Sequence, residues 1–192
     1  MTRTFIALEL DESVQRFLAA ALQQLARKLP SVRWVDPASI HLTLAFLGDL
    51  TDEQVAEAIA SADSAARQVS PFEYRLARLG TFGSPERPRV LWMGVKDPSG
   101  SLPRLHHLLR RELEPRGMPV ETRGFSPHLT LARLKTPLPF TEQQTLNDLL
   151  DEQPIQASLP CRVASVSTIK SELLRSGALY TPLHHSLLVD PR

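Results

Sequence analysis

One seven-residue sequence occurs twice in the chain, and each copy begins with a histidine. The first copy reads HLTLAFL from His41, and the second reads HLTLARL from His128, 87 residues later. Six of the seven positions are identical. A single His-x-Thr arises often by chance, but two such heptads, one in each half of the chain, indicate an internal duplication.

Each heptad alternates as a β-strand does. Side chains at positions i and i+2 of a strand share one face, so His41 and Thr43 point away from the leucines between them. The same holds for His128 and Thr130. If a pseudo-two-fold axis relates the two halves, the polar faces look at each other across a cleft. We therefore expect two imidazoles and two hydroxyls to converge on one small volume.

These four groups suit the opening of a cyclic phosphate by water. The reaction needs a base on the attacking oxygen and an acid on the leaving oxygen, on opposite sides of phosphorus. Histidine titrates near neutrality, so one ring can be neutral while the other is protonated. Thr43 and Thr130 can donate hydrogen bonds to the non-bridging oxygens. We expect no metal and no cofactor, because a strained five-membered cyclic ester is already reactive.

The paired motifs resemble the H-x-T-x signature of the 2H phosphoesterase superfamily. Further segments narrow the resemblance to the bacterial and archaeal RNA 2′,3′-cyclic phosphodiesterases, also described as 2′–5′ RNA ligases. The segments that carry it run nearly end to end: FIAL from Phe5, HLTLAFLG from His41, RVLWMGV from Arg89, FSPH from Phe125 and GALYTPL from Gly177.

The resemblance implies a role for each site residue. His41 would give a proton to the leaving O3′, and His128 would take a proton from water, so that a 2′-phosphate remains. Arg133 would contact the phosphate, with a surface salt bridge as the alternative. Phe46, at the matching position of the first heptad, would stack on a base, with a core position as the alternative. Strict alternation puts Arg133 on the leucine face, so the strand must end or bulge before it, or the side chain must curl round the edge.

Hydrophobic periodicity and turn residues predict the elements that carry the heptads. The expected helices cover residues 12–29, 51–67, 102–113 and 141–150. Thr51 with Gln54, and Thr141 with Gln144, have the spacing of capping boxes. The expected strands cover residues 4–10, 32–35, 40–47, 72–79, 90–95, 129–134, 162–169, 172–175 and 180–189, with a turn-rich segment at 80–88.

Strand pairs with little between them predict an α+β fold with mostly antiparallel sheets. We expect one domain over residues 1–192. The resemblance adds two pseudo-symmetric lobes, each a sheet with helices on its outer face, which enclose a central cleft.

Composition narrows the class of protein. The net charge of +1 shows no global signature of polyanion binding. Residues 86–135 hold ten Lys/Arg against five Asp/Glu, which predicts either solvated surface or a phosphate-attracting face. The lone Cys161 excludes a disulfide framework and a cysteine-based zinc site, and it fits a core position. The acidic N-terminus does not resemble a signal peptide, and no segment has the length of a membrane span. We expect a monomer in the cytoplasm.

The expected partner is RNA with a 2′,3′-cyclic phosphate end, and four alternatives stay open. The same site could run in reverse as a 2′–5′ RNA ligase, or it could act on a small cyclic nucleotide. A metallohydrolase could use the two histidines as ligands, although neither heptad has carboxylate or cysteine partners nearby. The last alternative is an RNA-binding module without catalytic activity.

Overall fold

The computed structural model describes residues 1–120, 124–134, 137–153, 155, 159–174 and 177–190. Its helices are α1 (Glu12–Lys28), α2 (Asp52–Ala66), α3 (Ser101–Leu113) and α4 (Phe140–Glu152), with short 3-10 turns η1 (Pro37–Ser39) and η2 (Glu114–Arg116). Its strands are β1 (Thr2–Glu9), β2 (Arg33–Trp34), β3 (His41–Leu50), β4 (Phe72–Ser84), β5 (Arg87–Lys96), β6 (His128–Arg133), β7 (Pro160–Val163), β8 (Ser165–Leu174) and β9 (Gly177–Leu187).

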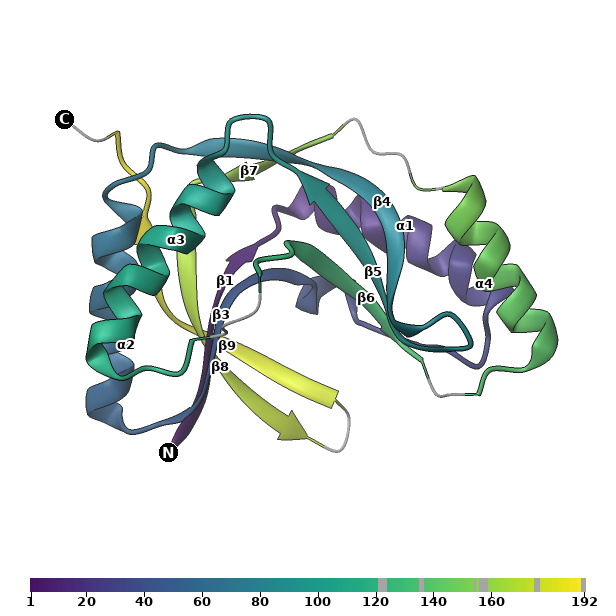
Figure 1. The fold of residues 1–192 in the computed structure, drawn as a ribbon, viewed down its shortest axis with the longest axis horizontal. Helices are drawn as coiled ribbons and strands as arrows, with labels where there is room; N and C mark the ends of the chain where they lie inside the picture. Colours follow the sequence, from purple (N-terminus) through teal and green to yellow (C-terminus); the bar gives the residue numbers. More distant parts are fainter. Residues whose placement is uncertain (121–123, 135–136, 154, 156–158, 175–176, 191–192) are drawn as a thin grey trace.

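The strands form one strongly bent sheet with the two heptads at its centre (Figure 1). The order is β7-β4-β5-β6-β3-β1-β8-β9, with β2 added against β6, and every pairing is antiparallel. β3 and β6 are joined through a single registered pair, Leu42 with Leu129. The sheet therefore consists of two half-sheets, β3-β1-β8-β9 and β6-β5-β4-β7, that meet at the heptads.

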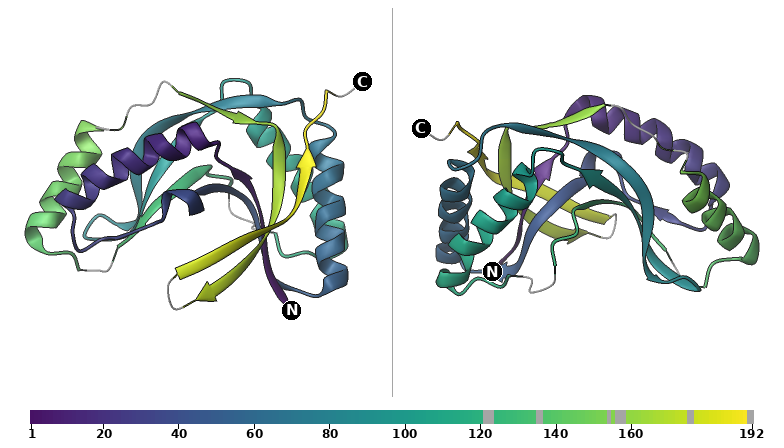
Figure 2. Two further views of the ribbon diagram at one scale, coloured as in Figure 1. Left: turned by 180° about the vertical axis from the view of Figure 1, so that it is seen from behind. Right: turned by 45° about the horizontal axis from the view of Figure 1, so that its top comes forward.

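The order of elements repeats along the chain, as a duplication predicts. Apart from the short strands β2 and β7 and the 3-10 turns, the first unit is β1-α1-β3-α2-β4 and the second is β5-α3-β6-α4-β8. The last strand of each unit joins the half-sheet of the other unit. β4 of the first unit pairs with β5 of the second, and β8 of the second unit pairs with β1 of the first. Figures 1 and 2 show α2 and α3 over one half-sheet and α1 and α4 over the other. The predicted α+β fold, with two lobes and helices on their outer faces, is confirmed.

The leucines of the heptads lie in the core, as the alternation predicts. Leu42, Leu129 and Leu131 are fully buried, and they belong to one apolar cluster that spans both halves. Cys161 is also buried, and burial raises the pKa of its thiol to about 12. The core position predicted for this cysteine is confirmed, and its thiol stays protonated at neutral pH.

One of the two predicted capping boxes is present. The Thr51 hydroxyl accepts a hydrogen bond from the Gln54 amide, and the Gln54 side chain accepts one from the Thr51 amide. The box predicted at Thr141 is wrong, because α4 begins one residue earlier at Phe140 and has no side-chain cap. A tertiary contact fastens this helix instead, since Glu142 in its first turn accepts hydrogen bonds from Ser31.

Two predicted strand boundaries are also wrong. The segment 80–88 is mostly strand, and only residues 85–86 form the turn between β4 and β5. Gly83, which has a φ of +110°, pairs with Pro88 next to a shift in the register of β4 and β5. Such an irregularity allows glycine and proline, which are typical of turns, to lie within a strand pair. Near the C-terminus, 162–169 and 172–175 belong to β7 and β8, divided at Ala164, and Arg175 lies outside the described residues. In the described part of the chain, no helix is long and apolar enough to cross a bilayer.

Removing the leucine at the centre of the sheet tests the join between the halves. Leu42→Ala should lower the free energy of unfolding by about 2–5 kcal/mol, because it leaves a cavity where the two half-sheets meet. Leu173→Ala, at a side chain that is 77% exposed, should change it by less than about 0.5 kcal/mol. Urea unfolding measures both. Equal and small losses would contradict a core that passes through Leu42.

Candidate active site

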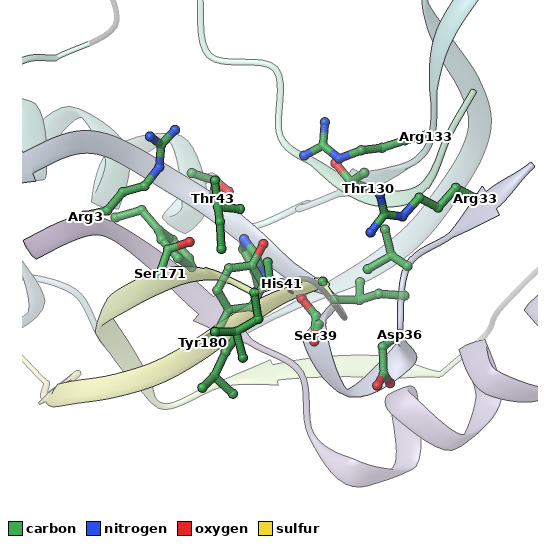
Figure 3. Close-up of a pocket in the computed structure, with 18 of the residues that line it drawn as sticks. Arg3, Arg33, Asp36, Ser39, His41, Thr43, Thr130, Arg133, Ser171 and Tyr180 are labelled. Atoms are coloured by element: carbon green, nitrogen blue, oxygen red, sulfur yellow. Dashed lines mark hydrogen bonds between the residues drawn. The ribbon is translucent and has the colours of Figure 1, made fainter. Parts of the chain in front are cut away.

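A cavity of about 850 Å³ opens on the face of the sheet opposite the leucines. All six residues predicted for the site line it, although they come from strands 87 residues apart in sequence. They are His41, Thr43 and Phe46 from β3, and His128, Thr130 and Arg133 from β6. β8 and β9 supply a further wall (Figure 3). The structure therefore brings the two polar faces together at one place.

A β-bulge in β3 brings Phe46 to the cavity. Thr43 pairs with Ala7 of β1 and Ala45 pairs with Ile6, so Leu44 has no partner. The extra residue resets the alternation, and position 46 therefore shares a face with the histidine instead of with the leucines. Phe46 is 48% exposed and lines the cavity, so the alternative of a core position is wrong.

The second heptad has the same bulge at the same position. Thr130 pairs with Trp92 of β5 and Ala132 pairs with Leu91, which leaves Leu131 without a partner on β5. Arg133 therefore lies on the cavity face. Of the two explanations that the sequence left open for this arginine, the bulge applies. Within the described residues Arg133 forms no ion pair, so its guanidinium is available to a ligand.

A backbone carbonyl two residues upstream fixes each imidazole. Nδ1 of His41 lies 2.8 Å from the Ser39 carbonyl oxygen, and Nδ1 of His128 lies 2.7 Å from that of Ser126. Because a carbonyl only accepts, both rings must carry their proton at Nδ1. Neither Nε2 has a hydrogen-bond partner among the described residues, so Nε2 is the atom that can gain or lose a proton in the cavity.

Aromatic side chains hold the two rings in place. Phe5 stacks on His41 with ring centres 4.7 Å apart, and Tyr180 meets the same ring edge-on at 5.1 Å. Phe82 meets His128 edge-on at 4.8 Å. The packing restricts rotation of both imidazoles, and around His41 it also excludes water.

The exclusion of water changes the pKa of His41. Burial lowers the pKa of this imidazole below its ordinary value, because the charged form loses hydration. The Ser39 carbonyl and the Glu9 carboxylate raise the pKa of His41, while the nearby His128 lowers it. Glu9 is the residue of β1 directly opposite His41 in the sheet. The ring is therefore poised to be neutral in the empty site and to take up a proton when negative charge arrives.

Both threonine hydroxyls face the same space. Thr43 and Thr130 line the cavity two residues after their histidines, and within the described part of the chain neither hydroxyl is engaged in a hydrogen bond. Both can therefore donate to an anion that lies between the imidazoles.

Sequence reasoning missed the other charged and aromatic residues of the cavity. Arg3, Phe5, Arg33 and Tyr180 line it, and Figure 3 shows Arg3 and Arg33 on opposite sides of His41. Alternation along β1 could have placed Arg3 beside Phe5, but no local pattern links Arg33 to the site. Among the described basic residues of segment 86–135, only Arg133 lines the cavity. The cavity therefore owes most of its positive charge to arginines that lie far apart in the sequence.

Comparisons with known proteins agree with this arrangement. A family model described as LigT-like phosphoesterase matches residues 8–92 and 94–180, one segment for each heptad. The RNA 2′,3′-cyclic phosphodiesterase of Aquifex aeolicus is 30% identical over 182 residues, which is 94% of each chain. The protein of the same name from Thermus thermophilus is 33% identical over 94% of this chain and 87% of its own.

Solved structures give the same result. The crystal structure of TT0787 from Thermus thermophilus matches with a TM-score of 0.79 and 30% identity, and 97% of each chain is covered. That of Escherichia coli LigT complexed with 3′-AMP matches with a TM-score of 0.73 and 25% identity over 98% of this chain and 99% of its own. This chain therefore belongs to the LigT-like phosphoesterases, within the 2H phosphoesterase superfamily that its two heptads predicted.

Proposed function

We propose that this protein opens 2′,3′-cyclic phosphate ends of RNA with water and leaves a 2′-phosphomonoester. His41 acts as the acid and His128 as the base, without a metal ion. The observation that carries the proposal is the pair of imidazoles whose Nδ1 atoms are fixed by carbonyls, so that two Nε2 atoms, which have no partner among the described residues, face one cavity. The relatives from Aquifex aeolicus and Thermus thermophilus, both named RNA 2′,3′-cyclic phosphodiesterase, support the substrate class.

The proposed reaction has the following bond changes. Nε2 of His128 takes a proton from water while the water oxygen attacks phosphorus. The bond from phosphorus to O3′ breaks, and the proton on Nε2 of His41 passes to O3′. The bond to O2′ stays intact. Each ring ends in the opposite protonation state, and exchange with solvent restores the starting state.

The remaining site residues stabilise the charge on phosphorus. The hydroxyls of Thr43 and Thr130 can donate to the two non-bridging oxygens, one from each half of the site. The Arg133 guanidinium can pair with the same oxygens in a bidentate manner. Phe46 offers an exposed ring at the side of the cavity, which suits stacking of a base.

The low pKa of His41 in the empty site fits its proposed role once substrate is bound. A cyclic phosphate carries one negative charge, and this charge favours the imidazolium form. The acid is then formed together with the complex that needs it. If the 5′-hydroxyl of another RNA replaces water at the same site, the product is a 2′–5′ linkage. RNA ligation therefore remains a second reaction that the same residues could catalyse. RNA substrates also fit the cytoplasmic location expected from the sequence.

The proposal that the reaction needs no metal ion rests on which potential metal-ligating side chains the described residues bring together. The described residues contain no group of three or more His, Cys, Asp or Glu side chains that could hold a metal ion together. The proton transfers in the proposed mechanism need only the two imidazoles.

Removing either imidazole tests the catalytic roles. His41→Ala and His128→Ala should each lower kcat on a cyclic-phosphate-ended oligonucleotide by about 10²–10⁴-fold, because each removes one proton transfer. Both variants should still bind the 2′-phosphate product. His107→Ala, an exposed histidine on α3, serves as the control and should keep full activity.

Two results of these assays would contradict the proposal. One is near-full activity in either cavity variant. The other is loss of wild-type activity in excess chelator, which would indicate a metal-bound hydroxide as the nucleophile.

The electrostatics of His41 can be measured in the free protein. In an NMR titration the pKa of His41 should lie below its ordinary value of about 6.5, and a bound 2′-nucleotide should raise it. Glu9→Gln should lower the pKa further, because it removes a nearby negative charge. Since the acid must be protonated, the fraction of His41 in the form that can give a proton should fall as pH rises through this pKa. A pKa of His41 above 6.5 in the empty site would contradict the described burial of the ring.

A further inference from the structure

Two arginines stand side by side on adjacent strands at one end of the cavity. Arg33 of the short strand β2 is paired directly with Arg133 of β6. Both residues line the cavity, and Figure 3 shows both guanidinium groups pointing into it. The pairing is long-range, since 100 residues separate the two positions in sequence.

This pair is electrostatically unfavourable in the empty site. Like charges directly opposite each other in an antiparallel pair destabilise the sheet. Within the described residues neither guanidinium forms an ion pair. Asp36 is the only acidic residue among those described along the cavity, and its carboxylate accepts a hydrogen bond from the Ala38 amide at the start of η1. A ligand that brings negative charge would relieve the repulsion.

The charge of the cavity exceeds what one cyclic phosphate can neutralise. Arg3, Arg33 and Arg133 face one acidic side chain, and the proposed mechanism adds the proton of His41. A cyclic phosphate brings a single negative charge, which Arg133 alone can match. The cavity volume of about 850 Å³ is near the upper end of the range of about 300–1,000 Å³ for small-molecule sites. There is thus both charge and room for a second phosphate.

We propose that Arg33 binds the phosphodiester on the 5′ side of the terminal nucleotide, so that the site prefers RNA ends over cyclic mononucleotides. The inference rests on the proposed function and adds the part of the substrate that lies outside the reacting ring. Arg33 lies beside Arg133 on the adjacent strand and widens the phosphate-binding surface at that end of the cavity. A guanidinium is suited to this role because it pairs with a phosphate through two parallel N–H donors.

A comparison of two substrates tests this site. The substrates are an oligonucleotide with a 2′,3′-cyclic phosphate end and the nucleoside 2′,3′-cyclic phosphate of the same base. Arg33→Gln should lower kcat/KM for the oligonucleotide by about tenfold and change that for the mononucleotide by less than about twofold. Arg33→Lys should retain part of the preference, because it keeps the charge and loses the bidentate fork. Arg104→Gln, an exposed arginine on α3 outside the cavity, is the matched control and should change neither rate.

Binding gives a second measurement that does not depend on turnover. The affinity for a 2′-phosphate-ended oligonucleotide should fall with salt, and Arg33→Gln should reduce the slope of log K against log salt by about 0.7, the value for one phosphate contact on a single strand. Circular dichroism of each variant verifies that the fold is intact.

The outcomes separate this inference from the proposed function. An equal loss on both substrates would place Arg33 at the scissile phosphate, and unchanged rates together with an unchanged salt slope would remove it from the site. Either result overturns the inference. If the wild-type protein cleaved neither substrate, the proposed function would fail, and the salt slope of binding would still decide whether Arg33 contacts a phosphate.

Discussion

The antiparallel contact between β3 and β6 determines the geometry on which the rest of the structure depends. An antiparallel pair is locally two-fold symmetric, so residues at matching positions of two identical sequences face each other across the axis. Here the pair is reduced to one registered contact between Leu42 and Leu129. The sheet can bend sharply there, and its two polar faces turn toward one another. The fully buried leucines fix this contact from the opposite side.

Backbone geometry then converts two ordinary hydrophobic strands into a site. A bulge one residue after each threonine rotates the rest of the heptad, so that Phe46 and Arg133 join the histidine face. A carbonyl two residues before each histidine fixes its tautomer. The bulge and the carbonyl contact both occur in each half of the chain, and both depend on the position of the main chain. The site is therefore positioned by the rigid centre of the sheet, while side chains outside the heptads give the two imidazoles different surroundings.

Much of this could be predicted from the sequence because the relevant signals are local. Alternation separated His41 and Thr43 from the buried leucines, and the repeat itself indicated two related halves. The bulges could not be located, because the residues around Leu44 keep an unbroken apolar pattern and only the register against β1 reveals the extra residue. Arg33 was missed for a similar reason: its place in the cavity depends on pairing with a strand 100 residues away. The cap predicted at Thr141 failed because a contact from Ser31 to Glu142, and not local chemistry, fastens the start of α4.

The proposed function requires two imidazoles to act on one phosphorus atom. The most direct measurement is a crystal structure of the protein with a bound 2′-nucleotide. We expect Nε2 of His41 within about 2.6–3.2 Å of O3′, Nε2 of His128 on the opposite side of the phosphate, and both threonine hydroxyls within hydrogen-bond distance of its oxygens. A phosphate held by the arginines alone, with either Nε2 beyond hydrogen-bond reach of the nucleotide, would contradict it.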